Sequence, residues 1–272
     1  MIDLMAQRHL EDLLIEDIGF GDITSQLLTH ETGSAHIVCK ERCILSGVEY
    51  ARYLFELRGL HVTGIKHDGE RLEKGDKIME ISGSYKEMLQ VERTALNILT
   101  RMSGITTETR AVVEQVQRVN PHCTVAATRK TLLRFFDKEA VITGGADPHR
   151  FRLEDMILLK DNHITILGIE EAIRRAKAHS FSKKIEIEVS SKDAALRAVR
   201  CGADIIMLDN MSPEAVEETV QSLKEYPVII EVSGGITRDN IETYAKTGVD
   251  VISLGYITHS VQAANMSLEV TP

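Results

Sequence analysis

Cationic side chains gather at the ends of apolar segments in the middle third of this chain. They are Arg129, Lys130, His149, Arg150 and Lys160. Arginine forms paired hydrogen bonds with carboxylates and phosphates, whereas lysine acts as a point charge. Several cations held close together need an anionic partner to offset their mutual repulsion. These residues therefore predict a site for a small ligand that carries several negative charges.

Carboxylates from two successive apolar segments would face the same site. Glu188 and Asp209 suit Mg²⁺, because proteins hold this ion through one or two carboxylates together with phosphate oxygens and water. The alternative is that Glu186 or Glu188 forms an ion pair with Lys130 or Lys160. Both arrangements are compatible, since a carboxylate among lysines stays ionised. We expect Glu186 to lie deeper than Glu188 and to be structural.

Small residues follow the last two apolar segments. Ser233, Gly234 and Gly235 come after the fifth segment, and Gly255 comes after the sixth. Many α/β barrels bind phosphate at this position through backbone N–H groups, and glycine lets the backbone approach the anion closely. A simple tight turn is the alternative, but the place of these residues in the repeat favours a phosphate site.

The segments that must position these side chains recur along the second half of the chain. Each is short, rich in β-branched residues and nearly continuous in its apolar character, as expected of parallel strands covered on both faces. They are residues 123–128, 155–159, 184–189, 204–208, 227–232 and 250–254, with helix-like stretches between most of them. An eight-unit barrel takes about 250 residues, and only about 150 carry this pattern. The sequence predicts an incomplete six-stranded α/β barrel, with a doubly wound open sheet as the alternative.

The first hundred residues mix helix and strand signals without a repeat. Residues 3–15 and the stretch from Tyr85 onwards place apolar side chains at helical spacing, while 34–40 is typical of a short strand. This half predicts an N-terminal α+β sandwich domain at 1–103. The barrel domain follows at 104–272, with the last few residues returning to the first domain. The predicted fold class is therefore α/β with two domains.

Composition excludes several classes of protein. The 32 Lys and Arg residues against 41 Asp and Glu residues give a net charge of -9, which disfavours nucleic acid and anionic membranes as partners. No apolar run approaches the roughly 20 residues of a membrane helix, and acidic residues come too early for a signal peptide. The 4 cysteines are too few and too scattered for a disulfide scaffold. We expect a soluble, cytoplasmic protein.

Several motifs in this order resemble the quinolinate phosphoribosyltransferase family. They are EDIGFGDITS (16–25), VERTALNILTRMSGI (91–105), ATRKT (127–131) and DPHRFRLEDMILLKDNHI (147–164), followed by IEIEV, IIMLDN, EVSGGI and GVDVISLG. The resemblance runs along nearly the whole chain. It implies an α/β N-terminal domain and an incomplete α/β barrel, in agreement with the count of six units.

The resemblance also implies a role for each candidate residue. The quinolinate pocket would be lined by Arg129, Lys130, His149, Arg150 and Lys160, and Thr128 would be a further substrate-binding residue. The ribose and the Mg²⁺-pyrophosphate region would face Glu188 and Asp209. The 5-phosphate would be held by Ser233, Gly234, Gly235 and Gly255. The catalytic residues would be Lys130, Glu188 and Asp209.

The same resemblance implies an oligomer with shared active sites. Arg93, in the VERT motif, would enter the pocket of a neighbouring subunit, so that the active unit is a homodimer or a higher even homo-oligomer. Three departures from the family pattern affect the local pocket shape. The usual GGG before His149 and Arg150 is GGA here, at 144–146. The loop after Lys130 is two residues shorter and lacks Pro-Gly, and Arg152 replaces a frequent glycine.

The implied reaction joins quinolinate to phosphoribosyl diphosphate with Mg²⁺, giving nicotinate mononucleotide, pyrophosphate and CO₂. One alternative is the pyrophosphorylase-like paralogue associated with molybdenum transport, but the intact LLKDNHI sequence argues against it. A second is a Schiff-base aldolase barrel that uses Lys130 or Lys160, which the neighbouring acids disfavour. A third is a metabolite sensor without catalytic activity, which the retained charged positions disfavour.

Overall fold

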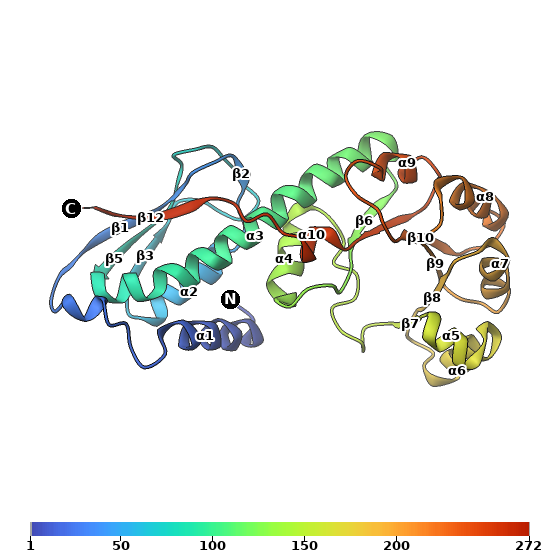
Figure 1. Ribbon diagram of the computed structural model, residues 1–272, viewed down its shortest axis with the longest axis horizontal. Helices are drawn as coiled ribbons and strands as arrows, with labels where there is room; N and C mark the ends of the chain where they lie inside the picture. The colour runs from blue at the N-terminus through green and yellow to red at the C-terminus, as the bar shows by residue number, and fades with distance from the viewer. Residues whose placement is uncertain (1, 272) are drawn as a thin grey trace. The chain divides into compact units, whose positions relative to one another are not determined.

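Residues 2–271 are described by a computed structural model, and their path is drawn in Figure 1. They form two compact units, neither of which is continuous in sequence. The first comprises residues 2–109, 132–145 and 260–271, and the second comprises 110–131 and 146–259. The sequence predicts a boundary between residues 103 and 104 and a return of the last few residues to the first domain. In the structure the first unit includes residues 260–271 and also residues 104–109 and 132–145.

An antiparallel sheet with strand order β12-β1-β5-β3 forms the base of the first unit. Its strands are β1 (Thr32–Cys39), β3 (His61–Gly64), β5 (Lys77–Ser84) and β12 (Met266–Thr271), and β2 (Cys43–Ile44) pairs separately with β4 (Arg71–Leu72). Ile37 of β1 lies opposite both Leu268 and Met79, which places apolar side chains together on one face. The end of the chain thus returns to this sheet.

Helices complete the first unit. They are α1 (Leu4–Ile18), the short 3-10 helix η1 (Ser25–Leu27), α2 (Val48–Leu57), α4 (Arg134–Gly144) and the first part of α3 (Tyr85–Val119). Asp3 caps α1 by accepting a hydrogen bond from the N–H of Met5 at 2.8 Å. Arg101 of α3 donates two hydrogen bonds of 2.7 Å to the buried carboxylate of Asp137 in α4.

The second unit contains a six-stranded parallel sheet with the order β6-β11-β10-β9-β8-β7. Its strands are β6 (Thr124–Ala127), β7 (Ile157–Leu159), β8 (Ile185–Val189), β9 (Ile205–Asp209), β10 (Ile229–Ser233) and β11 (Val251–Leu254). The order begins at β6 and ends at β7, so the barrel is incomplete. The predicted fold class is confirmed, with each strand inside or next to its predicted segment.

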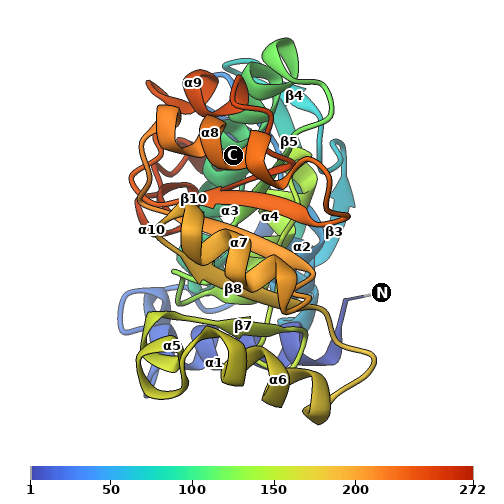
Figure 2. The ribbon, with the colours of Figure 1, turned by 90° about the vertical axis from the view of Figure 1, so that its right-hand side faces the viewer.

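Helices follow the strands of the second unit, and Figure 2 looks onto the layer formed by α6, α7 and α8. They are α5 (Asp161–Leu167), α6 (Ile169–His179), α7 (Lys192–Arg200), α8 (Pro213–Leu223), α9 (Ile241–Ala245) and α10 (Tyr256–His259). Ser212 caps α8 by accepting a hydrogen bond from the N–H of Ala215, and Pro213 occupies the first helical position, where its missing N–H costs nothing. Among the described helices, none is both long enough and apolar enough to cross a membrane.

Candidate functional site

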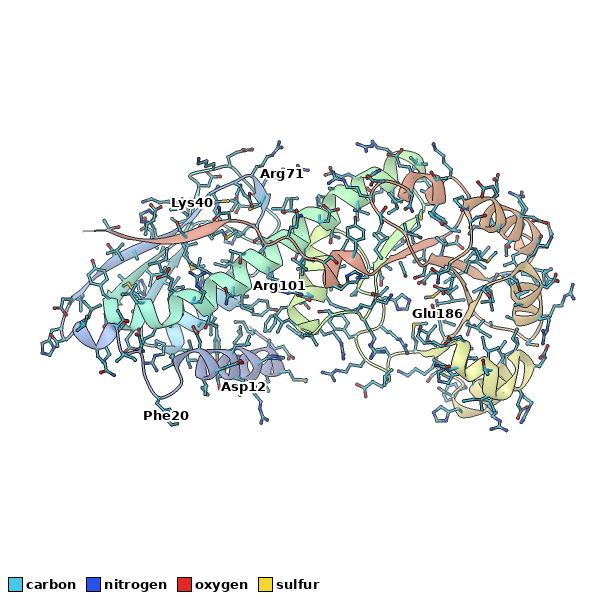
Figure 3. The ribbon with its side chains drawn as sticks, in the orientation of Figure 1. Asp12, Phe20, Lys40, Arg71, Arg101 and Glu186 are labelled. Carbon is cyan, nitrogen blue, oxygen red and sulfur yellow. The ribbon has the colours of Figure 1, made fainter. Side chains whose placement is uncertain are left out.

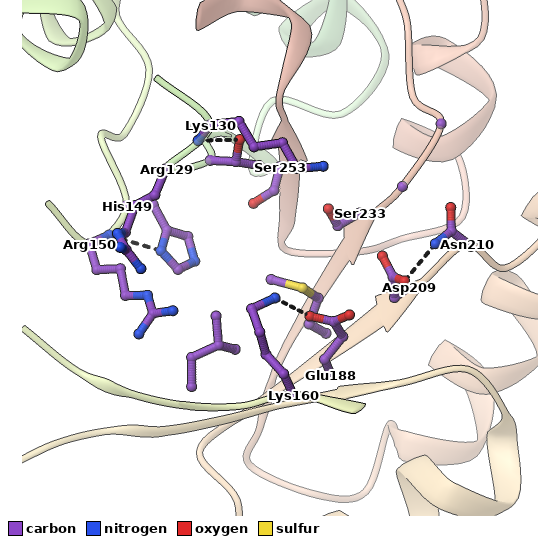
Figure 4. A pocket seen from close by; sticks show the side chains of 15 residues that line it. Arg129, Lys130, His149, Arg150, Lys160, Glu188, Asp209, Asn210, Ser233 and Ser253 are labelled. Atoms are coloured by element: carbon purple, nitrogen blue, oxygen red, sulfur yellow. Dashed lines mark hydrogen bonds and ion pairs between the residues drawn. The ribbon is translucent and has the colours of Figure 1, made fainter. Parts of the chain in front are cut away.

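A cavity of about 460 Å³ opens at the carboxyl ends of the parallel strands in the second unit (Figure 4). All but two of the predicted site residues line it. The lining includes Thr128, Arg129, Lys130, His149, Arg150, Lys160, Glu188, Asp209, Ser233, Gly234 and Gly235. Parallel strands end at one edge, so residues distant in sequence converge there. With Ser253 of β11 also in the lining, the cavity receives groups from all six strands of the sheet or the loops that follow them.

The two remaining predicted residues have different positions. Gly255 follows β11 and lies next to the side chain of Lys130, which lines the cavity. A Cβ added to Gly255 would lie 3.3 Å from Cδ of Lys130. The carbonyl oxygen of Lys130 also accepts a hydrogen bond of 3.3 Å from the hydroxyl of Thr258. Arg93 is exposed on α3 in the first unit and is not among the residues that line this cavity.

Carboxylates occupy one side of the cavity. Glu188 accepts a hydrogen bond of 2.5 Å from Nζ of Lys160, which is one of the ion pairs expected from the sequence (Figure 4). Asp209 accepts one of 2.6 Å from the side-chain amide of Asn210. Burial and the nearby charge of Glu188 raise the pKa of Asp209. This corner therefore favours an added cation.

Two arginines occupy the opposite side. The Nε atom of Arg129 is buried and has no hydrogen-bond partner among residues 2–271. Burial and the neighbouring charge of Arg129 lower the pKa of Arg150. Buried donors without acceptors and repelling guanidinium groups are both costly. An anion placed between the two side chains would relieve both costs.

A buried cluster of charged and polar side chains holds His149. Its Nε2 atom lies 3.3 Å from Glu231 and 3.4 Å from Glu186, and the Ser253 hydroxyl donates to the other oxygen of Glu231. Burial disfavours the charged imidazole, whereas hydrogen bonds and charge from the two carboxylates raise the pKa of His149. The Arg150 N–H, which donates a hydrogen bond to Nδ1, opposes a second ring proton, and this contact fixes the protonation of the ring. Burial raises the pKa of Glu186.

The interior position expected for Glu186 is confirmed. Its side chain has 0% relative exposure and lies inside the second unit (Figure 3). Glu231, only 2% exposed, and Ser253 are contributors that the sequence analysis missed. An acid within the apolar run of β10 was the available signal, since a buried carboxylate must find partners.

On the glycine-rich side of the cavity, the backbone at Asn210 lies close to the turn formed by Ser233 and Gly234. Asn210 has a left-handed φ of 54°, and its N–H donates a hydrogen bond of 2.9 Å to the carbonyl oxygen of Ser233. A Cβ at Gly234, where φ is 94°, would lie 2.3 Å from Oδ1 of Asn210. Only glycine fits this turn without displacing Asn210. Asn210 lines the cavity but was not among the predicted site residues.

Cations, carboxylates and a glycine turn around one cavity define an α/β-barrel protein that binds small polyanions. Residues 22–103 match the N-terminal domain of quinolinate phosphoribosyl transferase, and residues 105–269 match its C-terminal domain. The chain belongs to the quinolinate phosphoribosyltransferase family.

The similarity to known proteins covers nearly the whole chain. A probable carboxylating nicotinate-nucleotide pyrophosphorylase from Methanothermobacter thermautotrophicus is 45% identical, covering 96% of this chain and 97% of the relative. One from Methanocaldococcus jannaschii is 46% identical, covering 99% of each. The solved structure of the nicotinate-nucleotide pyrophosphorylase from Francisella tularensis is 35% identical, with a TM-score of 0.91 over 98% of this chain and 96% of that one.

Proposed function

We propose that this chain transfers the phosphoribosyl group of phosphoribosyl diphosphate to quinolinate and removes one carboxylate, giving nicotinate mononucleotide, pyrophosphate and CO₂. The observation that carries the proposal is the unpartnered, buried Nε of Arg129 beside the repelled guanidinium of Arg150. These side chains suit a pyridine with two carboxylates, because arginine pairs with carboxylates in a planar, bidentate manner. The matched relatives, named as carboxylating pyrophosphorylases, support the same reaction.

Binding and orientation are the first tasks of the cavity residues. Arg129, Arg150 and His149 would hold the ring carboxylates and direct the ring nitrogen toward the ribose. The turn at Ser233 and Gly234 would hold the 5-phosphate through backbone N–H groups. Holding both reactants in register converts an encounter in solution into a reaction within one complex.

Ribosyl transfer develops negative charge on the pyrophosphate and positive charge on the ribosyl carbon, and the cavity offers groups of opposite charge to each. The bond between ribose and pyrophosphate breaks with its electron pair on the departing oxygen, which Lys130 stabilises. Glu188 or Asp209 stabilises the positive charge that develops at the ribosyl carbon. The ring nitrogen then forms the new bond and becomes positively charged. CO₂ leaves from the adjacent carbon, and the electron pair of the broken bond stays on that carbon, where the positive ring nitrogen stabilises it. A proton then takes up this pair and forms the new C–H bond.

A magnesium ion belongs to the same proposal. The pKa of Asp209, raised by burial and by the charge of Glu188, indicates a corner where two carboxylates repel and a cation fits. Glu188 and Asp209 would hold Mg²⁺ mainly through substrate oxygens and water. When bound, the ion supplies charge stabilisation for the pyrophosphate group.

The assembly and compartment complete the proposal. The family resemblance implies that Arg93 enters the site of a second copy of the chain, in a homodimer or a higher even homo-oligomer. Arg93 is exposed on the first unit, which leaves it available to such a copy. The acidic composition supports a cytoplasmic enzyme without nucleic-acid or membrane partners.

The direct test is product formation. Purified protein with quinolinate, phosphoribosyl diphosphate and Mg²⁺ should yield nicotinate mononucleotide, detected by NMR or HPLC. A chelator should abolish turnover, and added Mg²⁺ should restore it. Absence of product with folded protein would refute the proposed function.

The same preparation tests the aldolase alternative. Lys160 contacts Glu188 at 2.5 Å, whereas Schiff-base chemistry needs a neutral, available amine. Borohydride should therefore trap no adduct between this protein and candidate carbonyl substrates. A trapped lysine adduct would instead support a Schiff-base aldolase activity.

A further inference from the structure

Glu231, which does not line the cavity, and Ser253, which does, make contacts that the proposed reaction does not use. Glu231 comes from β10 and Ser253 from β11, and their side chains are 2% and 3% exposed. One oxygen of Glu231 accepts a hydrogen bond from the Ser253 hydroxyl, and the other lies 3.3 Å from Nε2 of His149. A carboxylate held at both oxygens has a fixed orientation.

The other ring nitrogen of His149 identifies which tautomer these contacts hold. The backbone N–H of Arg150 donates a hydrogen bond of 2.8 Å to Nδ1, so Nδ1 is an acceptor and carries no proton. The ring proton is therefore on Nε2, where it faces Glu231. A second proton on Nδ1 would have to displace the Arg150 amide.

The backbone at His149 depends on these contacts. Its φ is 52°, a left-handed conformation that residues with a side chain seldom adopt, and its N–H donates to Asp147 at 2.6 Å. The ring, the Arg150 amide and the turn are thus linked. Without Glu231, Nε2 would keep only the longer contact of 3.4 Å with Glu186, which would loosen the ring and the backbone that carries Arg150.

A metal ion is the other possible occupant of this cluster. His149, Glu186 and Glu231 offer ligand atoms within 4.8 Å of one another. A metal bound to Nε2 needs the lone pair of that nitrogen. Because Nδ1 accepts a hydrogen bond from the Arg150 amide, the ring proton is on Nε2, where it blocks the lone pair. Glu231 is also fixed by Ser253. The hydrogen bonds therefore favour a positioning role over metal binding.

We propose that Glu231 is a positioning residue for the anion site: with Ser253 it holds His149 as the Nε2–H tautomer, and His149 in turn orients the Arg150 amide and side chain. This inference rests on the proposed function, because quinolinate is the anion that Arg150 would orient. Glu231 touches neither substrate in this scheme and acts through His149.

Two variants test the inference, with steady-state kinetics and the ¹⁵N NMR signals of His149 as readouts. Glu231→Gln keeps the shape of the side chain and removes its charge. Glu231→Leu combined with Ser253→Ala removes both members of the buried hydrogen bond, so that neither is left unpaired. Ser222→Ala is the matched control, because its hydroxyl donates to a helix carbonyl of α8.

The KM for quinolinate should rise about 10- to 100-fold in both variants, as when a residue that orients a binding histidine is lost. The KM for phosphoribosyl diphosphate and the thermal midpoint should stay near those of the wild type. The His149 signals, assigned by comparison with His149→Gln, should shift away from the Nε2–H tautomer. Ser222→Ala should change none of these.

Two results would overturn the inference. One is an unchanged quinolinate KM together with an unchanged tautomer in both variants. The other is an equal rise of both KM values with a lowered thermal midpoint, which would indicate a merely structural role. If the wild type makes no product, the proposed function fails, whereas the tautomer measurement still tests the inference because it needs no substrate.

Discussion

Lys130 is a cavity cation with two neighbours on the segment that follows β11. Gly255 leaves room beside its Cδ atom, and Thr258 holds its carbonyl oxygen. The stem of the side chain therefore runs along a backbone that carries no Cβ, while its ammonium group remains among the cavity residues. An ammonium group at this position can stabilise the negative charge of a departing phosphate oxygen.

Lys130→Ala should lower kcat by about 10²- to 10³-fold, because a single preorganised electrostatic group contributes on that scale. The fold should be preserved, since Lys130 is exposed and its backbone hydrogen bonds do not need the side chain. Product formation by HPLC and the thermal midpoint are the measurements. Lys246→Ala, an exposed lysine at the end of α9, is the control. Near-normal turnover would reject the role of Lys130.

At the scale of elements, α3 is held against the segment that leads into β12. Gly104 faces this segment within the first unit, and a Cβ there would lie 2.1 Å from the carbonyl oxygen of Gln262 and 3.1 Å from Cα of Ala263. Both atoms belong to the backbone, so no side-chain rotation can relieve the contact. The approach of the two segments therefore requires glycine.

Gly104→Ala should destabilise the protein by about 1 to 3 kcal/mol, the usual cost of forcing extra atoms into a packed interface. The sign of the change in unfolding free energy is informative, because replacing a helical glycine by alanine without a clash would stabilise the protein by about 1 kcal/mol. Urea unfolding measures the free energy. Asn97→Ala, at an exposed position of the same helix, is the control. A stabilised Gly104→Ala variant would contradict the packing described for α3.

At the scale of the whole molecule, the predicted residues divide between the two units. The cavity residues belong to the second unit, and Arg93 belongs to the first. If Arg93 serves the cavity of a second copy, two different defects can complement each other. A symmetric dimer has two equivalent sites, so a hybrid dimer would contain one sound site.

Arg93→Ala and Lys160→Ala should each be nearly inactive alone, whereas mixed and reassociated protein should recover activity. Random pairing leaves up to about a quarter of all sites sound, because half of the dimers are hybrids with one good site each. Turnover of the mixture, with subunit exchange verified by mass spectrometry, is the measurement. Verified hybrids without recovered activity would argue against a shared site.

The sequence by itself determined the repeating elements and the end of each strand at which the polar groups lie. Apolar runs and caps such as Ser212 before Pro213 are local signals, so they specify strands and helices without knowledge of distant residues. Because parallel strands present their carboxyl ends at one edge, the convergence of Arg129, Lys160 and Asp209 also followed from local order.

Only the tertiary structure decided which of these groups touch. The contact of Glu231 with His149 and Ser253 depends on strand register and on a loop that lies 82 residues earlier in the chain. The left-handed backbone of Asn210 depends on the neighbouring strand, whose turn approaches it at Gly234. Such contacts arise from pairing between segments distant in sequence, and no local pattern of residues records them.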